Sequence, residues 1–544
     1  MSKNFKYRSK YPGVLMKDWL RFHPYQAPVP SDYFYLRVCN EVQAVLYSVE
    51  DIKGILKISK DEITELSCML TAWFEDLISE SRIYQAFVEQ HYKLYTKYLP
   101  FYSYDEYFPG EIHQIDVQFL IWYFLSKKHF HQILISPESN LVEYFGFNIF
   151  EIFDNHWEIA PENPAMKKFL QISLSEADFY TIRYKIDWLV LNSYLFFFYG
   201  DDCTKDKIEI LKKRDEGTEF EMSYLINLTQ EVHDDYVHNT VTSLLGFTGK
   251  QWLAFVLGEN HPLHKPLLQL SNKKSGMFLY LGKDDKSLFF RHIASGYELK
   301  VTRKSMKMDS TVIEGKLALN IGFVQWMNEW WFSGIYVQSE MNDEILLEET
   351  SNPYKADLFA DVDEKMKLNR EMYANFVKYN HQKPIAFLKN KHELNQLIND
   401  FFVFHNNEMA KANPEAAKKF NKQPKNKLVT PLQDDEDMVD NGEGLLFFFS
   451  STSGIEIAHG INQIIPDKEN VFYDPDHEDQ DAMNLLAEPT YSHELVKYLT
   501  ENYQLKNLKL NGQKTANLIK DNLDFISRFQ RRKSYYPTPR FSMV

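Results

Sequence analysis

The chain is poor in several residue types, and each shortage excludes a class of protein. Its 544 residues include only three cysteines, Cys39, Cys68 and Cys203, which form no Cys-x-x-Cys pair and leave at least one thiol without a partner. This excludes a disulfide framework or a cysteine-based zinc site and is typical of a reducing compartment. With 20 glycines and 21 prolines, the composition is neither collagen-like nor linker-like.

Long apolar runs are also absent. The longest, Trp188 to Tyr199, spans twelve residues and contains Asn192 and Ser193, whereas a membrane-spanning helix needs about 20. The first residues, MSKNFKYRSKYPGVLMKDWLRF, are basic but hold no apolar stretch long enough for a signal peptide. The sequence therefore predicts a cytoplasmic protein without a membrane partner.

Positive charge is in deficit, because 61 lysines and arginines face 76 acidic residues, a net charge of −15. Such a field repels nucleic-acid phosphates and excludes bulk coating of nucleic acid, although it leaves room for a local basic patch. Hydrophobic residues make up 44% of the chain, which excludes disorder throughout. Aromatic residues are abundant at 15%, and they are favoured at protein interfaces.

Periodicity predicts an α+β fold that is mostly helical, with a small antiparallel β-barrel or curved sheet inserted near the middle. Residues 1–271 have helical spacing, and the apolar stretch from Ile115 to Lys128 predicts a buried helix. Residues 272–340 contain six short apolar segments separated by turn residues, the pattern of a small β-module. Helical spacing returns in residues 341–410.

The remaining residues contain the clearest predicted boundary. Residues 411–427 carry six lysines against one glutamate, and residues 434–443 carry six acids without a base. Such blocks predict a charged flexible linker over 411–444, with a regulatory or docking segment as the alternative. Residues 445–544 are predicted to form a mainly helical unit that includes a helix from Ser453 to Ile465.

Common catalytic and cofactor motifs fail on individual residues. Gly249-Lys250 is followed by Gln251 and lacks the upstream glycine of a phosphate-binding loop. The pairs His392-Glu393 and His493-Glu494 lack the second histidine that a zinc protease helix needs. No cofactor is predicted.

The acidic loop at residues 474–481 also fails as an EF-hand, because it lacks the required glycine and the closing glutamate. A looser divalent-metal site formed by Asp474, Asp476 and His477 remains as an alternative to a solvated acidic turn.

The segment EVHDDYVHN (231–239) contains the catalytic candidates His233, Asp234 and His238. A His-Asp pair holds the metal ion of some phosphohydrolases, and Asp234 and His238 lie four residues apart, where a helix allows them to share a cation. The alternative is structural: His233 shares a helical face with Ile226 and Val237 and is a satisfied histidine at the edge of a core.

The C-terminal residues RFQRRKSYYPTPRF place Arg528, Arg531, Arg532 and Lys533 beside aromatic rings. Basic and aromatic side chains together bind phosphates and stack on bases, which makes this cluster a candidate for polyanion or nucleic-acid binding. The alternative is that cations in the last turn of a helix complement its dipole.

Three tryptophans, Trp326, Trp330 and Trp331, flank a short predicted hairpin loop. We expect them to form the core and rim of the β-module. Exposed rings would instead make a binding platform.

Five stretches carry a resemblance to a known family: KDWLRFHPYQAPVPSDYFYLRVCNEV (17–42), GEIHQIDVQFLIWYFLSK (110–127), FLYLGKDDKSLFFRHIASGYELKV (278–301), NEWWFSGIYVQ (328–338) and SGIEIAHGINQIIPDKENVFYDP (453–475). Together they resemble an uncharacterised bacterial family, found chiefly in Bacteroidetes, that carries only a domain-of-unknown-function label. The resemblance implies a full-length likeness and an intracellular bacterial protein. It supplies no activity, cofactor or site residue.

Three functions follow from these patterns. The first is a non-catalytic interaction or scaffold protein that binds another protein through its β-module or its aromatic-rich surface. The second is a metal-dependent phosphohydrolase centred on His233 and Asp234. The third is a polyanion-binding protein that uses the C-terminal basic cluster.

Overall fold

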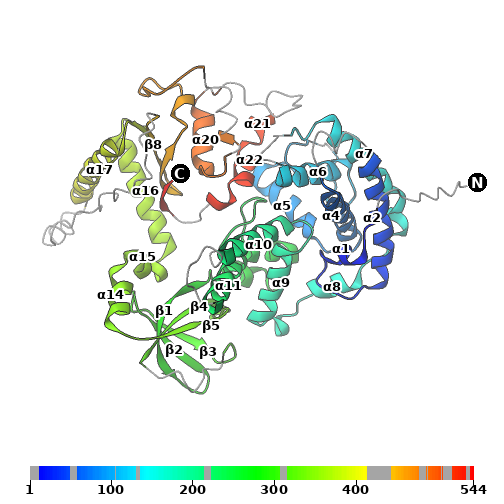
Figure 1. Ribbon diagram of the computed structural model, residues 1–544, viewed down its shortest axis with the longest axis horizontal. Coiled ribbons are helices and arrows are strands. Elements are labelled where there is room, and N and C mark those ends of the chain that lie inside the picture. Colours follow the sequence, from blue (N-terminus) through cyan, green and yellow to red (C-terminus); the bar gives the residue numbers. More distant parts are fainter. Residues whose placement is uncertain are drawn as a thin grey trace, which may run out of the picture. The chain divides into compact units, whose positions relative to one another are not determined.

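The structure is a computed structural model that describes residues 12–48, 58–103, 106–129, 135–212, 222–306, 315–412, 443–476, 485–486, 488–503, 505, 518–534 and 539–544 (Figure 1). The chain forms two compact units, one up to Phe359 and one that begins at Ala360. Each unit has its own sheet and helices, so the fold belongs to the α+β class. In the described residues, every helix is too short or too polar to cross a membrane.

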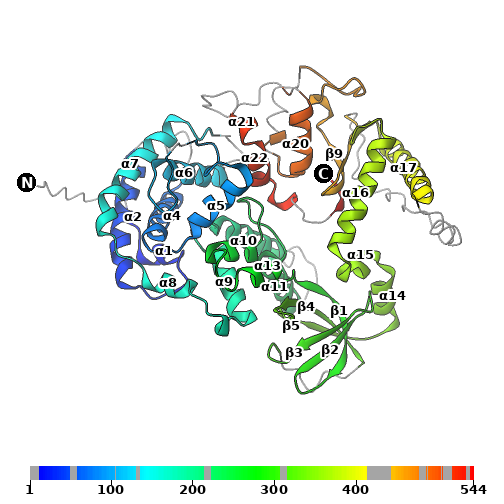
Figure 2. The same ribbon diagram turned by 180° about the vertical axis from the view of Figure 1, so that it is seen from behind.

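The first unit begins with a helical part. Its α-helices are α1 (Met16–Leu20), α2 (Pro30–Ser48), α4 (Lys60–Ile78), α5 (Ile83–Tyr95), α6 (Gln114–His129), α7 (Asn140–His156), α8 (Pro164–Leu170), α9 (Phe179–Leu191), α10 (Phe197–Lys212), α11 (Met222–His238), α12 (Gly249–Leu257) and α13 (His264–Gln269). Two short 3-10 helices, η1 (Trp157–Ile159) and η2 (Leu174–Glu176), lie among them. Figure 2 shows α9, α10 and α11 as neighbours.

Local signals explain where these helices begin and which are buried. The Oγ of Ser59 accepts a hydrogen bond from Glu62 N at 3.2 Å, and the Glu62 carboxylate accepts from Ser59 N at 2.7 Å, a capping box that starts α4. The predicted helix from Ile115 to Lys128 is α6, and its apolar residues from Val117 to Leu125 are buried. A helix that is apolar on all sides is stable only inside a core.

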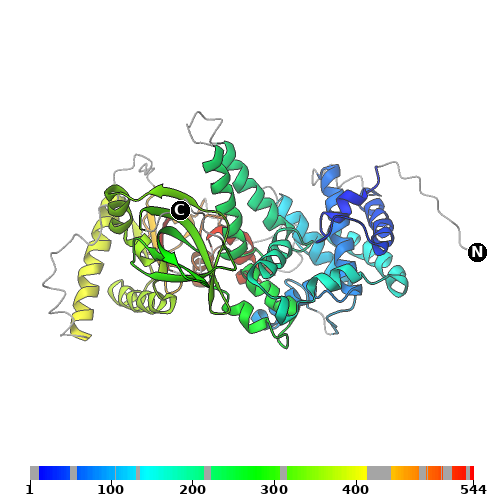
Figure 3. The same cartoon turned by 90° about the horizontal axis from the view of Figure 1, so that it is seen from below.

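A curved six-stranded sheet follows the helices. Its strands are β1 (Lys274–Lys283), β2 (Ser287–His292), β3 (Glu298–Thr302), β4 (Leu317–Trp326), β5 (Glu329–Phe332) and β6 (Val337–Glu340), in the order β1-β2-β3-β5-β4-β6. Residues 274–279 of β1 pair with β4 and residues 278–283 pair with β2, and the register with β2 shifts at a bulge between Tyr280 and Gly282. A bulge bends a strand and increases its twist. The predicted small barrel or curved sheet is therefore present, in its curved form (Figure 3).

The curved sheet approaches a ring, because β1 also pairs with β4. Strands β3 and β5 pair at a single parallel position, Val301 and Trp330. Few backbone hydrogen bonds therefore join the two strands there. The interior is filled by apolar side chains, of which Phe278, Phe290 and Phe323 are completely buried. Helices α14 (Asp343–Ser351) and α15 (Pro353–Ala356) and the 3-10 helix η3 (Asp357–Phe359) complete the unit.

The tryptophan-rich hairpin joins the curved sheet to the helical part. Trp326 is buried and its Nε1 donates to Ala177 O at 2.8 Å. Trp331 is also buried, with its ring centroid 6.0 Å from those of Phe179 and Tyr180 at the start of α9. These rings form an internal contact and not a binding platform, in agreement with the expectation of a core and rim.

The second unit is built around a four-stranded sheet. Its elements are α16 (Val362–Tyr379), β7 (Ile385–Leu388), α17 (Lys391–Ala412), β8 (Leu445–Ser450), β9 (Gly454–His459), α20 (His493–Asn502), α21 (Leu518–Asp521), α22 (Leu523–Gln530) and β10 (Arg540–Met543), with the 3-10 helices η4 (Asn462–Ile464) and η5 (Arg532–Ser534). The strand order is β10-β9-β8-β7, and β10 runs parallel to β9. Phe376 of α16 and Phe401 of α17 pack against Phe447 and Phe449 of β8.

Two expectations for the second unit differ from the structure. The predicted helix from Ser453 to Ile465 is instead strand β9 followed by η4, because residues 454–459 pair with β8 along their whole length. The second unit also takes β7 from the predicted helical segment 341–410. Most of the predicted linker, residues 413–442, lies outside the described residues.

Gly334 lies where the sheet meets α11, and its environment admits only glycine. Its φ is +94°, in the left-handed region, and a Cβ built on it would lie 2.4 Å from Asp234 Oδ2. Gly296 has a similar φ of +71°, but no atom lies within 4 Å of the position of its Cβ. Alanine at Gly296 therefore introduces backbone strain alone, whereas alanine at Gly334 introduces backbone strain and a steric overlap.

We expect Gly334→Ala to lower the free energy of unfolding by at least about 2 kcal/mol more than Gly296→Ala. Both variants incur the left-handed backbone cost of about 1 kcal/mol, but only the first displaces a buried carboxylate. Calorimetric melting of both variants checks this. Equal losses would show that the carboxylate moves aside at little cost.

Candidate functional site

The predicted catalytic residues lie on α11, but each has its own partners. His233 Nε2 lies 2.5 Å from Asp187 Oδ2 on α9, and Lys207 Nζ on α10 lies 2.8 Å from its Nδ1. Because a lysine ammonium only donates, Nδ1 accepts and Nε2 carries the proton that Asp187 accepts. His233 is therefore a satisfied histidine at the edge of the helical part.

Asp234 is buried and faces cations. Its Oδ1 accepts from Arg183 and from Gln230 Nε2, and its Oδ2 accepts from Lys273 Nζ at 2.9 Å and from Ser333 Oγ at 3.3 Å. The side chain of Lys273 has no exposed surface. Burial alone would raise the pKa of Asp234, but Lys273 and Arg183 outweigh this effect and lower it.

His238 is buried, and among the described residues neither of its ring nitrogens has a hydrogen-bond partner. Its ring stacks on Phe179 with the centroids 5.7 Å apart. Burial lowers the pKa of His238 to about 3, and the nearby Arg183 contributes to this shift. The imidazole is therefore neutral across the physiological range.

These contacts do not form a metal site. The two oxygens of Asp234 already accept from the cationic side chains of Arg183 and Lys273, whose charges also repel a metal ion from His238. The three side chains predicted as a phosphohydrolase centre thus have different surroundings: Asp234 lies in an ion-pair network, His233 pairs with Asp187 and Lys207, and His238 stacks on Phe179.

The loop predicted to bind a metal is described only in part. Asp474 Oδ1 accepts from Asp476 N at 2.9 Å, an Asx turn on the surface of the second unit. His477 lies outside the described residues.

The predicted polyanion-binding cluster is largely internal. Arg531 is completely buried and donates to Leu485 O, and Arg532 is 7% exposed. Arg528 Nε donates to Asp524 Oδ2 at 2.8 Å, and Lys533 is exposed. Because phosphate contacts need accessible cations, Arg531 and Arg532 are unsuited to the predicted role.

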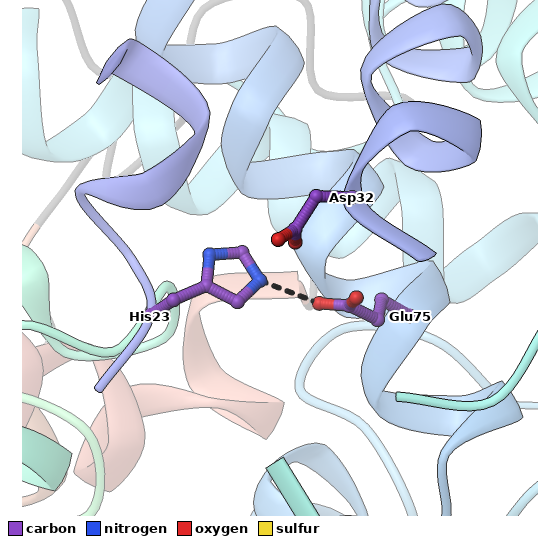
Figure 4. A group of neighbouring side chains, drawn as sticks. All are labelled: His23, Asp32 and Glu75. Atoms are coloured by element: carbon purple, nitrogen blue, oxygen red, sulfur yellow. Dashed lines mark hydrogen bonds and ion pairs between the residues drawn. The ribbon is translucent and has the colours of Figure 1, made fainter. Parts of the chain in front are cut away.

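A cluster that sequence reasoning missed lies in the helical part of the first unit. His23 follows α1, Asp32 is in the first turn of α2, and Glu75 is near the end of α4; one ligand atom from each lies within 4.8 Å of the other two. All three are buried. Figure 4 shows the His23 ring pointing at Glu75, with the Asp32 carboxylate beside this pair; His23 Nε2 lies 2.7 Å from Glu75 Oε2.

Neighbouring groups fix the three side chains. Asp32 Oδ1 accepts from Trp19 Nε1 at 2.8 Å and from Tyr25 OH at 3.0 Å, and its Oδ2 accepts from Val29 N at 2.6 Å. Glu75 Oε1 accepts from Asn163 Nδ2 at 2.9 Å, and His23 Nδ1 lies 3.1 Å from Trp19 O. Burial alone would lower the pKa of His23, but the carboxylates of Glu75 and Asp32 raise it above its ordinary value.

Asp76 lies between this cluster and a surface cleft. It lines a small cavity of about 10 Å³ together with His23 and Glu75, and it also lines a cleft of about 630 Å³. Its carboxylate accepts from Ile83 N and Tyr84 N, the first backbone donors of α5, and from Tyr194 OH. Burial raises the pKa of Asp76 to about 6, and these hydrogen bonds offset part of the shift.

The cleft is bordered by the α4–α5 turn. Its lining includes Glu80, Arg82, Trp157 and Glu162. Glu80 and Arg82 have φ values of 51° and 65°, in the left-handed region that is unfavourable for residues with a side chain. The hydrogen bonds of Asp76 to α5 hold this strained turn in place.

The fold therefore defines an α+β protein with a helical part, a curved sheet and a second sheet-containing unit. Residues 13–277 match the model of the family described as "Protein of unknown function (DUF3843)", so this part of the chain is similar to that family. The match includes two of the five stretches quoted above, 17–42 and 110–127. Neither a curated protein nor a solved structure matches the chain.

The family range contains both the buried cluster and the cleft, but the sequence marks neither strongly. The ligand-type residues His23, Asp32 and Glu75 come from three elements separated by up to 52 positions, so no motif spacing links them. The one available signal was the pair His23 and Asp32 on either side of a proline-rich stretch, and the aspartate there resembles an ordinary helix cap.

We expect Asp234→Asn to destabilise the first unit by about 3 kcal/mol, because it removes the buried carboxylate that Lys273 and Arg183 share and leaves Lys273 only the partly exposed Glu231. The neighbouring Asp235 is exposed, and its Oδ1 accepts from Asn239. Asp235→Asn is therefore the matched control and should change stability by less than about 0.5 kcal/mol. Chemical denaturation of both variants measures the difference, and similar losses would contradict the ion-pair interpretation.

The neutral His238 makes the fold sensitive to acid. The unfolded chain binds a proton at His238 below a pKa of about 6.5, whereas the folded chain does so only near 3, so stability falls as the pH decreases between these values. His238→Leu should reduce this fall by up to about 1.4 kcal/mol per pH unit between pH 6 and pH 4. Melting curves across this range measure the slope, with the exposed His392→Leu as control. An unchanged slope in His238→Leu would show that the folded protein protonates this ring.

Proposed function

We propose that the chain is a non-catalytic interaction protein and that the cleft beside the α4–α5 turn binds a lysine- or arginine-bearing segment of a partner protein. The observation that carries this proposal is the cleft itself, which combines carboxylates, an aromatic ring and a volume of about 630 Å³. Concave sites with a few convergent polar groups are the usual places of ligand binding.

The charges that line the cleft favour a cation. Glu80 and Glu162 contribute two exposed carboxylates against the single guanidinium of Arg82, and Arg82 is already paired with Glu89 at 3.2 Å. Lys167 Nζ lies 2.7 Å from Glu162 Oε2 and 3.9 Å from Glu80 Oε2. The mouth of the cleft thus accommodates an ammonium group, and an incoming lysine can take the place of Lys167.

The cleft also offers an aromatic surface and a stable wall. Trp157 is only partly buried, and a tryptophan face attracts lysine and arginine side chains by a cation–π interaction. Because Asp76 anchors the α4–α5 turn, the part of the cleft wall that carries Glu80 is already ordered before a ligand binds. Binding therefore loses no conformational entropy by ordering this turn.

The test uses the full chain and a fluorescein-labelled peptide of alternating lysine and glycine at physiological salt. We expect Glu80→Ala combined with Glu162→Ala to weaken binding at least tenfold, because both carboxylates that receive the ammonium are lost. Fluorescence anisotropy measures the affinity, and a peptide of alternating glutamate and glycine should not bind.

Glu344→Ala combined with Glu364→Ala is the matched control, since these exposed acids lie away from the cleft residues in sequence and the net charge changes equally. Equal weakening in both double variants would mean that the peptide responds only to the overall charge of −15 and would refute the proposal.

A further inference from the structure

We propose that His23, Asp32 and Glu75 bind one divalent transition-metal ion inside the helical part of the first unit. This site is separate from the proposed cleft interaction and does not depend on it. Four observations carry the inference: the spacing of the ligand atoms, the balance of buried charge, the outer hydrogen bonds and a water-sized cavity.

The spacing fits a single ion. Metal–ligand bonds to imidazole nitrogen and carboxylate oxygen are about 2.1 Å long, so two ligands at right angles lie about 3 Å apart. His23 Nε2 and Glu75 Oε2 are 2.7 Å apart, and the third ligand atom, from Asp32, is within 4.8 Å of both. Small rotations of the side chains bring the three atoms around one centre.

The buried charge is unbalanced without an ion. Asp32 and Glu75 are 0% and 3% exposed, and among the described residues neither carboxylate pairs with a lysine or an arginine. Even a doubly protonated His23 leaves one negative charge over in this interior. A divalent ion with a neutral imidazole cancels both carboxylates, and buried charges are normally paired or bound to metal.

The outer hydrogen bonds have the pattern of a metal site. His23 Nδ1–H donates to Trp19 O and Nε2–H donates to Glu75 Oε2, so a metal ion that displaces the Nε2 proton meets a lone pair already directed at the cluster. Tyr25 and Trp19 hold Asp32 Oδ1, whereas Oδ2 accepts a single bond from Val29 N and keeps a lone pair. Such outer partners orient metal ligands and raise their affinity.

The adjoining cavity leaves room for a further ligand. Its volume of about 10 Å³ corresponds to one water molecule, and His23, Glu75 and Asp76 are among the residues that line it. One imidazole and two carboxylates suit Zn²⁺, Mn²⁺ or Fe²⁺ better than Cu⁺, which prefers sulfur, or Ca²⁺, which prefers oxygen alone.

The first test uses the full-length protein after removal of metals by a chelator. Zn²⁺, Mn²⁺ and Co²⁺ are added one at a time, and the bound metal is counted by plasma mass spectrometry after gel filtration. We expect about one equivalent per chain for at least one ion, a higher melting temperature, and for Co²⁺ a visible d–d absorption band that differs from that of the hydrated ion. No retained metal and no thermal shift with any of the three ions would overturn the proposal.

Variants then locate the bound ion. Glu75→Gln keeps the shape of the side chain and should lower the affinity at least tenfold, and Tyr25→Phe should lower it by a smaller factor through the orientation of Asp32. His91→Gln is the matched control, because His91 is a buried histidine of the same helical part outside the cluster. If Glu75→Gln binds metal as tightly as the wild type, the ion lies elsewhere and the assignment is wrong. If a variant does not fold, the metal content, the melting temperature and the Co²⁺ spectrum of the wild-type protein still test whether the chain binds an ion.

Discussion

The burial of the Lys273 ammonium against the Asp234 carboxylate is the interaction on which the first unit depends. Lys273 directly precedes β1, Asp234 lies on α11, and Arg183 on α9 completes the network. Two charges out of water are stable only when they stay together, so the helical part and the curved sheet hold each other in one arrangement. Trp326 and Trp331 cover the same junction with apolar surface. The helices and the sheet therefore form one folding unit, although their sequence patterns differ.

The abundance of aromatic residues has a second explanation in the helical part. Its tyrosines are internal hydrogen-bond donors to buried acids: Tyr84 and Tyr107 donate to Asp116, Tyr194 to Asp76 and Tyr25 to Asp32. A phenol brings a large apolar surface together with one donor, so it satisfies a carboxylate without adding a charge. A high aromatic content is compatible with binding surfaces and with this internal role. The hydrogen bonds of these four tyrosines show the internal role.

Sequence periodicity predicted those parts of the fold that depend on local patterns. The buried helix α6 and the curved sheet follow from apolar stretches of helical and alternating spacing. The strand β9 was missed because Gly454–His459 is a short apolar run, and only its pairing with β8 distinguishes a strand from a helix. The candidate site was missed for a related reason. Asp234 attracted attention as an acid next to a histidine, but its partners Arg183 and Lys273 are distant in sequence, and so are the three residues of the buried cluster.

The pairing of β1 also bears on how this protein can be divided. The family match ends at residue 277, inside a strand that extends from Lys274 to Lys283. A fragment cut at that position keeps Lys273 and Asp234 but loses β4, to which residues 274–279 are bonded, and Ser333, which completes the carboxylate's hydrogen bonds. Such a fragment ends in an unpaired strand edge, a common template for aggregation. The end of the family match and the end of the first compact unit, at Phe359, are thus different positions, and a fragment designed on the structure includes the whole curved sheet.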